Sequence, residues 1–207
     1  MRRPSRQTAL VAALLMLALV APHPVTAAVV TVINRDGPGE GLTDPAVRAP
    51  VGGNTGTTLG AQRLNALQFA ADIWGTYLIS SVEIKVGATF DAQTCTGFSA
   101  TLGSAGPAAA FFDFIGATPS TLYPSALADK VAGMDLDRGF DNIRARFNLN
   151  LGSSGSCDLD FYLGLDANPA TFADIDLVAV ALHELGHGLG FAPAFNVSTG
   201  AEGLGLD

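Results

Sequence analysis

Two segments of the chain carry apolar residues at three- and four-residue steps, a spacing that predicts amphipathic helices. The first covers residues 59–79 and follows Thr57 and Thr58, either of which can cap the N-terminus of a helix. Its apolar positions are Leu64, Leu67, Ala71, Trp74 and Leu78. The pattern therefore predicts one long helix that packs on a sheet.

The second helical pattern covers residues 175–190, with Asp174 or Asp176 as the N-cap. Its apolar positions are Ile175, Val178, Ala179, Leu182, Gly186 and Leu189. We expect these positions to share one buried face of the helix.

Residues 80–91 contain the clearest strand, because apolar and polar residues alternate there with a period of two. A first strand is expected at 29–33. Weaker strand patterns and one short helical pattern also occur, the strands at 98–102, 108–114, 142–150 and 158–165 and the helix at 125–133. This order of a long helix, several strands and a final helix predicts an α+β fold with a mixed sheet.

Residues 1–27 have the pattern of a signal peptide. Three arginines precede an unbroken apolar run from Ala9 to Ala21, and Ala27 and Ala28 suit cleavage by signal peptidase. The run is short for a bilayer span and no second hydrophobic segment of spanning length follows, which argues against a retained anchor. The sequence predicts export to the periplasm or the extracellular space, without stable membrane insertion after cleavage, and one domain in 28–207.

Acidic residues outnumber basic ones, with 19 Asp and Glu against 11 Lys and Arg and a formal net charge of −8. The balance becomes more acidic once the leader arginines are removed. Binding to phosphate groups requires clusters of Lys and Arg, and the sequence contains none. Nucleic acid is therefore excluded as an expected partner.

Cys95 and Cys157 are the two cysteines of the chain, and export would place them in an oxidising compartment. We expect them to form a disulfide, with two buried free thiols or half of a metal site as the alternatives. A cysteine-ligated zinc site is disfavoured, because neither cysteine has a partner at the short spacing that such sites use.

The strongest chemical pattern is His-Glu-Leu-Gly-His at residues 183–187, within the second predicted helix. A four-residue step places His183 and His187 on the same side of a helix, where both imidazoles can bind one Zn²⁺. Glu184 then lies beside the metal and can act as the general base toward a zinc-activated water. The alternative is a chance pentapeptide on a core helix. The two histidines are the only ones that follow the leader, which favours the metal site.

A third protein ligand is not evident from the sequence. Gly190 occupies the glycine position of the longer three-histidine motif, but Pro193 stands where that motif has its last histidine. Glu202 and Asp207 are the carboxylates that follow the helix, and both are weak candidates. We therefore expect that the sequence is the N-terminal part of a longer catalytic domain.

Aspartates gather in two further segments, with Asp135, Asp137 and Asp141 in the first and Asp158, Asp160 and Asp166 in the second. Calcium binds in oxygen-rich loops of this kind, although EF-hand spacing is absent and ordinary solvated turns remain the alternative. The strand expected at 158–165 fits either an ordinary core strand or a sheet edge that binds an extended peptide.

The chain resembles a family of exported bacterial zincin-type proteins that carry the segment HELGHGLGF, which is residues 183–191 here. The likeness extends to residues 52–75, 80–91, 94–107, 123–133 and 142–148. It implies a zincin-like fold and a secreted zinc metallopeptidase that acts on protein or peptide substrates. The alternative is a non-catalytic zincin-like surface or binding module that retains the zinc site.

Overall fold

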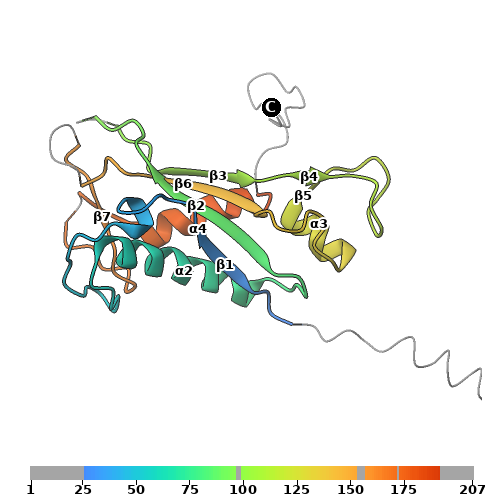
Figure 1. Cartoon of the computed structure of the whole chain (residues 1–207), viewed down its shortest axis with the longest axis horizontal. Helices are drawn as coiled ribbons and strands as arrows, with labels where there is room; N and C mark the ends of the chain where they lie inside the picture. The colour runs from blue at the N-terminus through green and yellow to red at the C-terminus, as the bar shows by residue number, and fades with distance from the viewer. Residues whose placement is uncertain (1–25, 97–98, 153–156, 172, 192–207) are drawn as a thin grey trace, which may run out of the picture.

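A four-stranded mixed sheet organises the fold (Figure 1). The computed structural model describes residues 26–96, 99–152, 157–171 and 173–191. The strands lie in the order β1, β2, β6 and β3, with bounds β1 Val30–Asn34, β2 Ile84–Asp91, β6 Ile143–Asn148 and β3 Gly103–Pro107. The first three are parallel, whereas β3 runs antiparallel to β6 and forms an edge. The predicted α+β class with a mixed sheet is confirmed.

The alternation of side chains along β2 and β6 fixes which face of the sheet is buried. Ile143, Ala145 and Phe147 point inward and are almost fully buried, whereas Arg144 and Arg146 between them are exposed. Because a strand places successive side chains on opposite faces, this pattern sets the register of the whole sheet. One face of the sheet therefore holds the core, and the other carries polar side chains.

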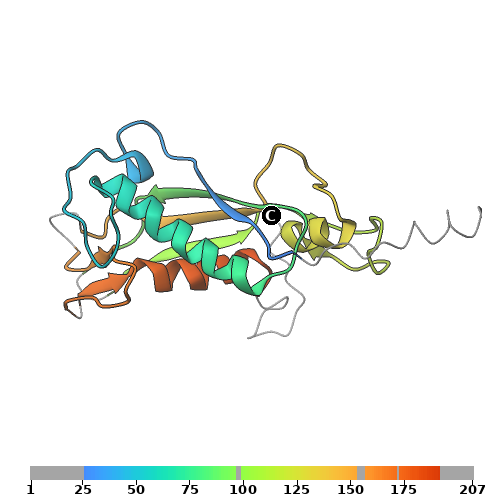
Figure 2. The same cartoon turned by 90° about the horizontal axis from the view of Figure 1, so that it is seen from below.

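Helix α2 (Leu59–Tyr77) packs against β1 on the inner face of the sheet (Figure 2). Thr58 is its N-cap, and the hydroxyl accepts a hydrogen bond from the amide of Ala61 at 3.2 Å. Ala66, Leu67 and Ala70 are almost completely buried. The predicted helix and one of its two predicted caps are thus confirmed.

Helix α4 (Leu177–Gly188) lies beside α2 and beneath β3 and β6. Asp176 is the N-cap, with its carboxylate accepting hydrogen bonds from the amides of Val178 and Ala179. The buried face differs from the predicted one, because Leu177, Ala181 and Leu185 are its most buried apolar residues and Ala179 is exposed. Contact with both α2 and the sheet rotates the buried face by about one residue from the face that the apolar pattern alone predicts.

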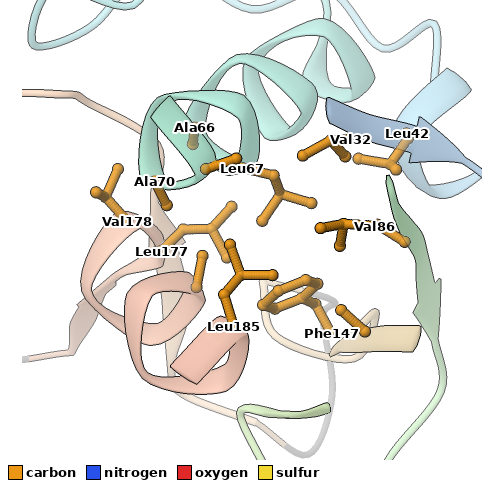
Figure 3. Close-up of a cluster of buried hydrophobic side chains, with 14 of the residues drawn as sticks. Val32, Leu42, Ala66, Leu67, Ala70, Val86, Phe147, Leu177, Val178 and Leu185 are labelled. Carbon is orange, nitrogen blue, oxygen red and sulfur yellow. The ribbon is translucent and has the colours of Figure 1, made fainter. Parts of the chain in front are cut away.

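The core forms where the two helices meet the sheet (Figure 3). Leu67 of α2, Leu177 and Leu185 of α4, Val86 of β2 and Phe147 of β6 point toward one another there. Gly188 allows α4 to approach the sheet closely, since a Cβ at this position would lie 2.3 Å from Cγ2 of the buried Ile143. A side chain at position 188 would therefore force α4 away from the strands.

Shorter elements surround the sheet, namely η2 Gly41–Thr43, β4 Ala110–Phe111, β5 Tyr123–Pro124, α3 Ser125–Ala132, β7 Asp160–Tyr162 and β8 Asp174–Asp176. Strand β7 pairs with β8 and not with the main sheet, so the alternative in which it forms an edge of that sheet is wrong, whereas Phe161 and Leu163 are buried in the core. The predicted signal peptide, residues 1–27, lies almost entirely outside the described residues. No helix among the described residues has the length and apolar character needed to cross a membrane.

Candidate metal centre

Helix α4 places the two predicted zinc ligands side by side. The Nε2 atoms of His183 and His187 lie 3.1 Å apart, and the rings are nearly perpendicular. His183 is exposed and His187 is half-buried, so both rings are accessible from the surface. Zinc–nitrogen bonds measure about 2.0–2.1 Å, so one ion can bind both nitrogens at this separation. The geometry and the donor atoms therefore fit a zinc ion.

The second nitrogen of His187 has a partner that orients the ring. Its Nδ1 lies 2.9 Å from the carbonyl oxygen of Phe191. A carbonyl oxygen can only accept, so Nδ1 carries the proton and donates it, which leaves the Nε2 lone pair free in the neutral ring. Backbone carbonyls commonly orient histidine ligands of metals in this way.

The carbonyl of Phe191 is held in place by the turn that ends α4. Gly190 has a φ of +103°, a value that side chains rarely permit, and it packs closely against Pro124. The Phe191 ring stacks on Trp74 of α2 with centroids 5.8 Å apart, and the indole of Trp74 donates to the carbonyl of Leu182 at 3.1 Å. Contacts from α2 thus position a group that orients His187, and the sequence gives no sign of this link.

Glu184 lies at the junction of α4 and the edge strand. It is 9% exposed, and within the described residues its carboxylate makes no hydrogen bond or ion pair. Together with His183 it lines an open depression of about 470 Å³ between α4 and the segment that leads into β3. The other lining residues are Thr101, Leu102, Gly103, Ala179 and Val180. A carboxylate without a structural partner that lines the same depression as His183 is free to exchange protons with a molecule bound there.

Gly103 is a site residue that the sequence analysis missed. A Cβ at this position would lie 3.3 Å from Cγ of Glu184, 3.2 Å from Cδ1 of Phe147 and 3.0 Å from the carbonyl oxygen of Arg146. A larger side chain would therefore displace Glu184, because the two other neighbours belong to the core and to the sheet backbone. Gly106, on the same strand, has open space at the equivalent position, with no atom within 4 Å.

We expect Gly103→Val to lower the rate of any reaction that depends on Glu184 by about 10- to 100-fold, because a displacement of about 1 Å has effects of this size. Metal content should remain unchanged, since the histidines are untouched. The measurement is kcat at saturating concentrations of a neutral peptide together with zinc content, and Gly106→Val, on the opposite face of the same strand, is the matched control. Equal activity of the two variants would contradict the proposed contact.

A third ligand does not join the two histidines within the described residues. No Cys, Asp, Glu or further His in these ranges forms a group of three with them. The candidates Glu202 and Asp207 lie outside the described residues. Two imidazoles and one neighbouring carboxylate are thus what the described part of the chain contributes to this centre.

The predicted disulfide is confirmed. Cys95, in the loop between β2 and β3, is bonded to Cys157, which precedes β7, with Cα atoms 5.4 Å apart. The bond connects the segment that leads into the edge strand with the segment that leads toward α4. Neither free thiols nor a cysteine-ligated metal site remains as an alternative.

The aspartates for which calcium binding and solvated turns were the two alternatives separate into different environments. Asp135 and Asp137 lie with the buried Asp129, with one oxygen of each within 4.8 Å of the others. Oδ1 of Asp137 is buried without a hydrogen-bond partner, and burial, followed by the charges of Asp129 and Asp135, raises the pKa of this carboxyl. Asp141 instead accepts two hydrogen bonds from Arg35.

The second aspartate segment forms no such group within the described residues. Asp166 accepts a hydrogen bond from the hydroxyl of Tyr162, which raises the pKa of that phenol to about 12. Asp160 accepts a hydrogen bond from the amide of Phe161. Calcium binding therefore stays a prediction. Within the described residues, Asp135 and Asp137 of the first segment, together with Asp129, are the aspartates close enough to share an ion.

Comparison with known proteins does not place the chain in a family. No protein-family model matches it, and neither a curated protein nor a solved structure does. The resemblance to exported zincin-type proteins therefore rests on the sequence motifs. Function must be argued from the geometry of the site.

Proposed function

We propose that this chain is the zincin-like catalytic part of a secreted zinc metallopeptidase. The observation that carries the proposal is the pair of imidazole nitrogens 3.1 Å apart on α4, adjacent to the unpartnered carboxylate of Glu184. A mixed sheet with a long helix and an HExxH helix on one face is the arrangement expected of a zincin-like domain. The single disulfide fits an oxidising compartment and supports export.

His183 and His187 would hold the metal through their Nε2 atoms. Imidazole donors suit zinc, which accepts nitrogen ligands and leaves a coordination position open in catalytic sites. Zinc in such a site supplies Lewis acidity toward a carbonyl group and makes water a stronger acid at neutral pH. The protein's own contribution is to fix the two rings, and Phe191 does so for His187.

Glu184 would carry the proton during peptide hydrolysis. Its carboxylate accepts a proton from water as the water oxygen bonds to the carbonyl carbon of the substrate. The same proton then passes to the nitrogen of the leaving amine as the C–N bond breaks. The products are an amine and a carboxylic acid, which loses its remaining proton to the solvent, and Glu184 returns to its starting state. Its position beside His183 in an open depression is consistent with this role.

Strand β3 offers a place for the substrate backbone. Within the described residues it pairs only with β6, and the amide of Asn148 donates to the carbonyl of Leu102. Because backbone groups of an antiparallel strand alternate between its two sides, those of Gly103 and Ala105 face the open side. An extended peptide can add to this edge as a further strand, directly above α4. Protein or peptide substrates are therefore the proposed class.

The second candidate is a zincin-like surface or binding module that keeps a zinc site without turnover. The observation that favours it is the absence of a third ligand among the described residues. Glu184 favours the enzyme, because a site that only binds metal has no need for an unpartnered carboxylate that lines the depression next to the ligands. The two candidates differ in turnover and share the metal.

Metal titration tests the feature that both candidates share. We expect the purified chain to bind one Zn²⁺ and His183→Ala and His187→Ala each to weaken binding by at least 100-fold, because one imidazole cannot replace two. The measurement is calorimetric titration of chelator-treated protein. Unchanged zinc affinity in both variants would show that the ion binds elsewhere.

A further inference from the structure

Two arginines stand in adjacent outward positions of β6, next to the edge strand. Arg144 and Arg146 are exposed on the face of the sheet opposite α2 and α4. Within the described residues neither makes a hydrogen bond or an ion pair. Other cations of the sheet face are engaged, since Arg35 pairs with Asp141 and Lys85 pairs with Asp135. The guanidinium groups of β6 thus have no ion-pair partner within the described residues, although Arg144 lines a hollow that also contains Asp137 and Asp141.

The residues between these arginines and the open edge are small. In the register of β3 with β6, Gly106 is opposite Arg144 and Ser104 is opposite Arg146. The position of a Cβ at Gly106 has no neighbour within 4 Å. Because Ser104 has a short side chain and Gly106 has none, the outward face of β3 leaves room for the arginine side chains to extend across it toward the open edge.

A peptide strand added to β3 would lie two strand spacings from β6, which is about 10 Å. Its side chains would alternate between the two faces of the sheet. One set would point toward α4 and the depression lined by apolar and small residues such as Leu102 and Val180. The other set would lie on the outward face, beyond Ser104 and Gly106. A glutamate of the peptide that extends toward β6 could there meet an arginine of β6 that extends toward the peptide.

We propose that Arg144 and Arg146 select peptides with carboxylate side chains at the outward-facing positions of the strand that binds to β3. The inference rests on the proposed function for its binding edge. The chain as a whole carries 19 acidic residues against 11 basic ones, so most of its surface repels acidic peptides. Arg144 and Arg146 thus place two positive charges on the strand next to the open edge.

The test uses three fluorescein-labelled octapeptides in which valine alternates with glutamate, glutamine or lysine. Each can place valine toward α4 and its polar residue outward. Binding is measured by fluorescence anisotropy to zinc-loaded Glu184→Gln protein, so that hydrolysis does not interfere. We expect the glutamate peptide to bind about tenfold more tightly than the glutamine peptide, an advantage that two exposed charge pairs can supply. The advantage should fall between 50 mM and 500 mM salt, about a threefold decrease in the screening length.

Arg144→Gln/Arg146→Gln is expected to reduce the advantage to less than twofold while leaving the glutamine peptide unaffected. Arg48→Gln/Lys130→Gln removes the same charge elsewhere and should preserve it. A glutamate peptide that binds no more tightly than the glutamine peptide, or an advantage that survives in the double-arginine variant, would overturn the inference. Failure of the zinc-loaded wild-type protein to cleave any peptide would instead reject the proposed function, whatever the binding order.

Discussion

Peptide hydrolysis by the Glu184→Gln variant is expected to be about 10²- to 10⁴-fold slower than hydrolysis by the wild-type protein, the range typical of a lost general base. Glutamine has nearly the same shape, and the Glu184 carboxylate makes no hydrogen bond or ion pair within the described residues. The substitution therefore removes proton transfer without removing a structural contact. Stability and zinc content should remain at the wild-type values.

The measurement is kcat on a neutral peptide at saturating zinc, with metal content determined on the same samples. Glu83→Gln provides the matched control, because Glu83 is exposed on the far side of the sheet from α4, and we expect it to change the rate by less than twofold. Retention of more than about a tenth of the wild-type rate in Glu184→Gln would mean that another group accepts the proton.

Loss of the disulfide is expected to have the largest effect on stability. Cys95 and Cys157 are 62 residues apart, and closing a loop of this length stabilises a fold by about 4 kcal/mol in the chain-entropy model. A domain of this size is stable by about 5–15 kcal/mol in total. Cys95→Ser/Cys157→Ser should therefore lose a large share of its free energy of unfolding.

Urea denaturation of the double variant and of the wild-type protein gives the difference directly. Wild-type protein reduced before unfolding should match the double variant, because both lack the same covalent link. A difference below about 1 kcal/mol between oxidised wild-type protein and the double variant would contradict the expected stabilisation.

The parts of the fold with strong local patterns were predictable from sequence. Thr58 and Asp176 are polar residues directly ahead of apolar helical patterns, and both cap the predicted helices. The spacing of His183 and His187 likewise predicted their relative position, because residues four positions apart lie on the same face of a helix. Local geometry decides these features, so no tertiary contact is needed to predict them.

Strand β3 was not predictable in the same way. Its residues, Gly103–Pro107, contain no large apolar side chain and no alternation, and the composition is that of a loop. Pairing with β6 and cover by α4 make this segment a strand, and both are tertiary effects. The role of Gly103 follows only from that packing. Its proximity to Glu184 is invisible in the sequence because 81 positions separate the two residues.

The cluster at Asp129 illustrates a third case. Asp135, Asp137 and Asp141 are neighbours in the chain, and their spacing predicts one group. In the structure the third member of the group is Asp129 of α3 and not Asp141. Asp141 binds Arg35, whereas Asp129 accepts hydrogen bonds from the amide of Leu136 and the side chain of Asn142. Which aspartates lie together therefore depends on their hydrogen-bond and ion-pair partners in the fold, and the spacing of aspartates along the sequence does not contain this information.

The most direct test of the central claim is peptide hydrolysis during stepwise return of Zn²⁺ to chelator-treated protein. We expect no hydrolysis without metal, a linear increase with added zinc, and a plateau at one ion per chain. The same titration with His187→Ala should give no increase in this range. Hydrolysis that persists without zinc, or full occupancy by zinc with no hydrolysis of any peptide, would contradict the proposal that this chain is a zinc metallopeptidase.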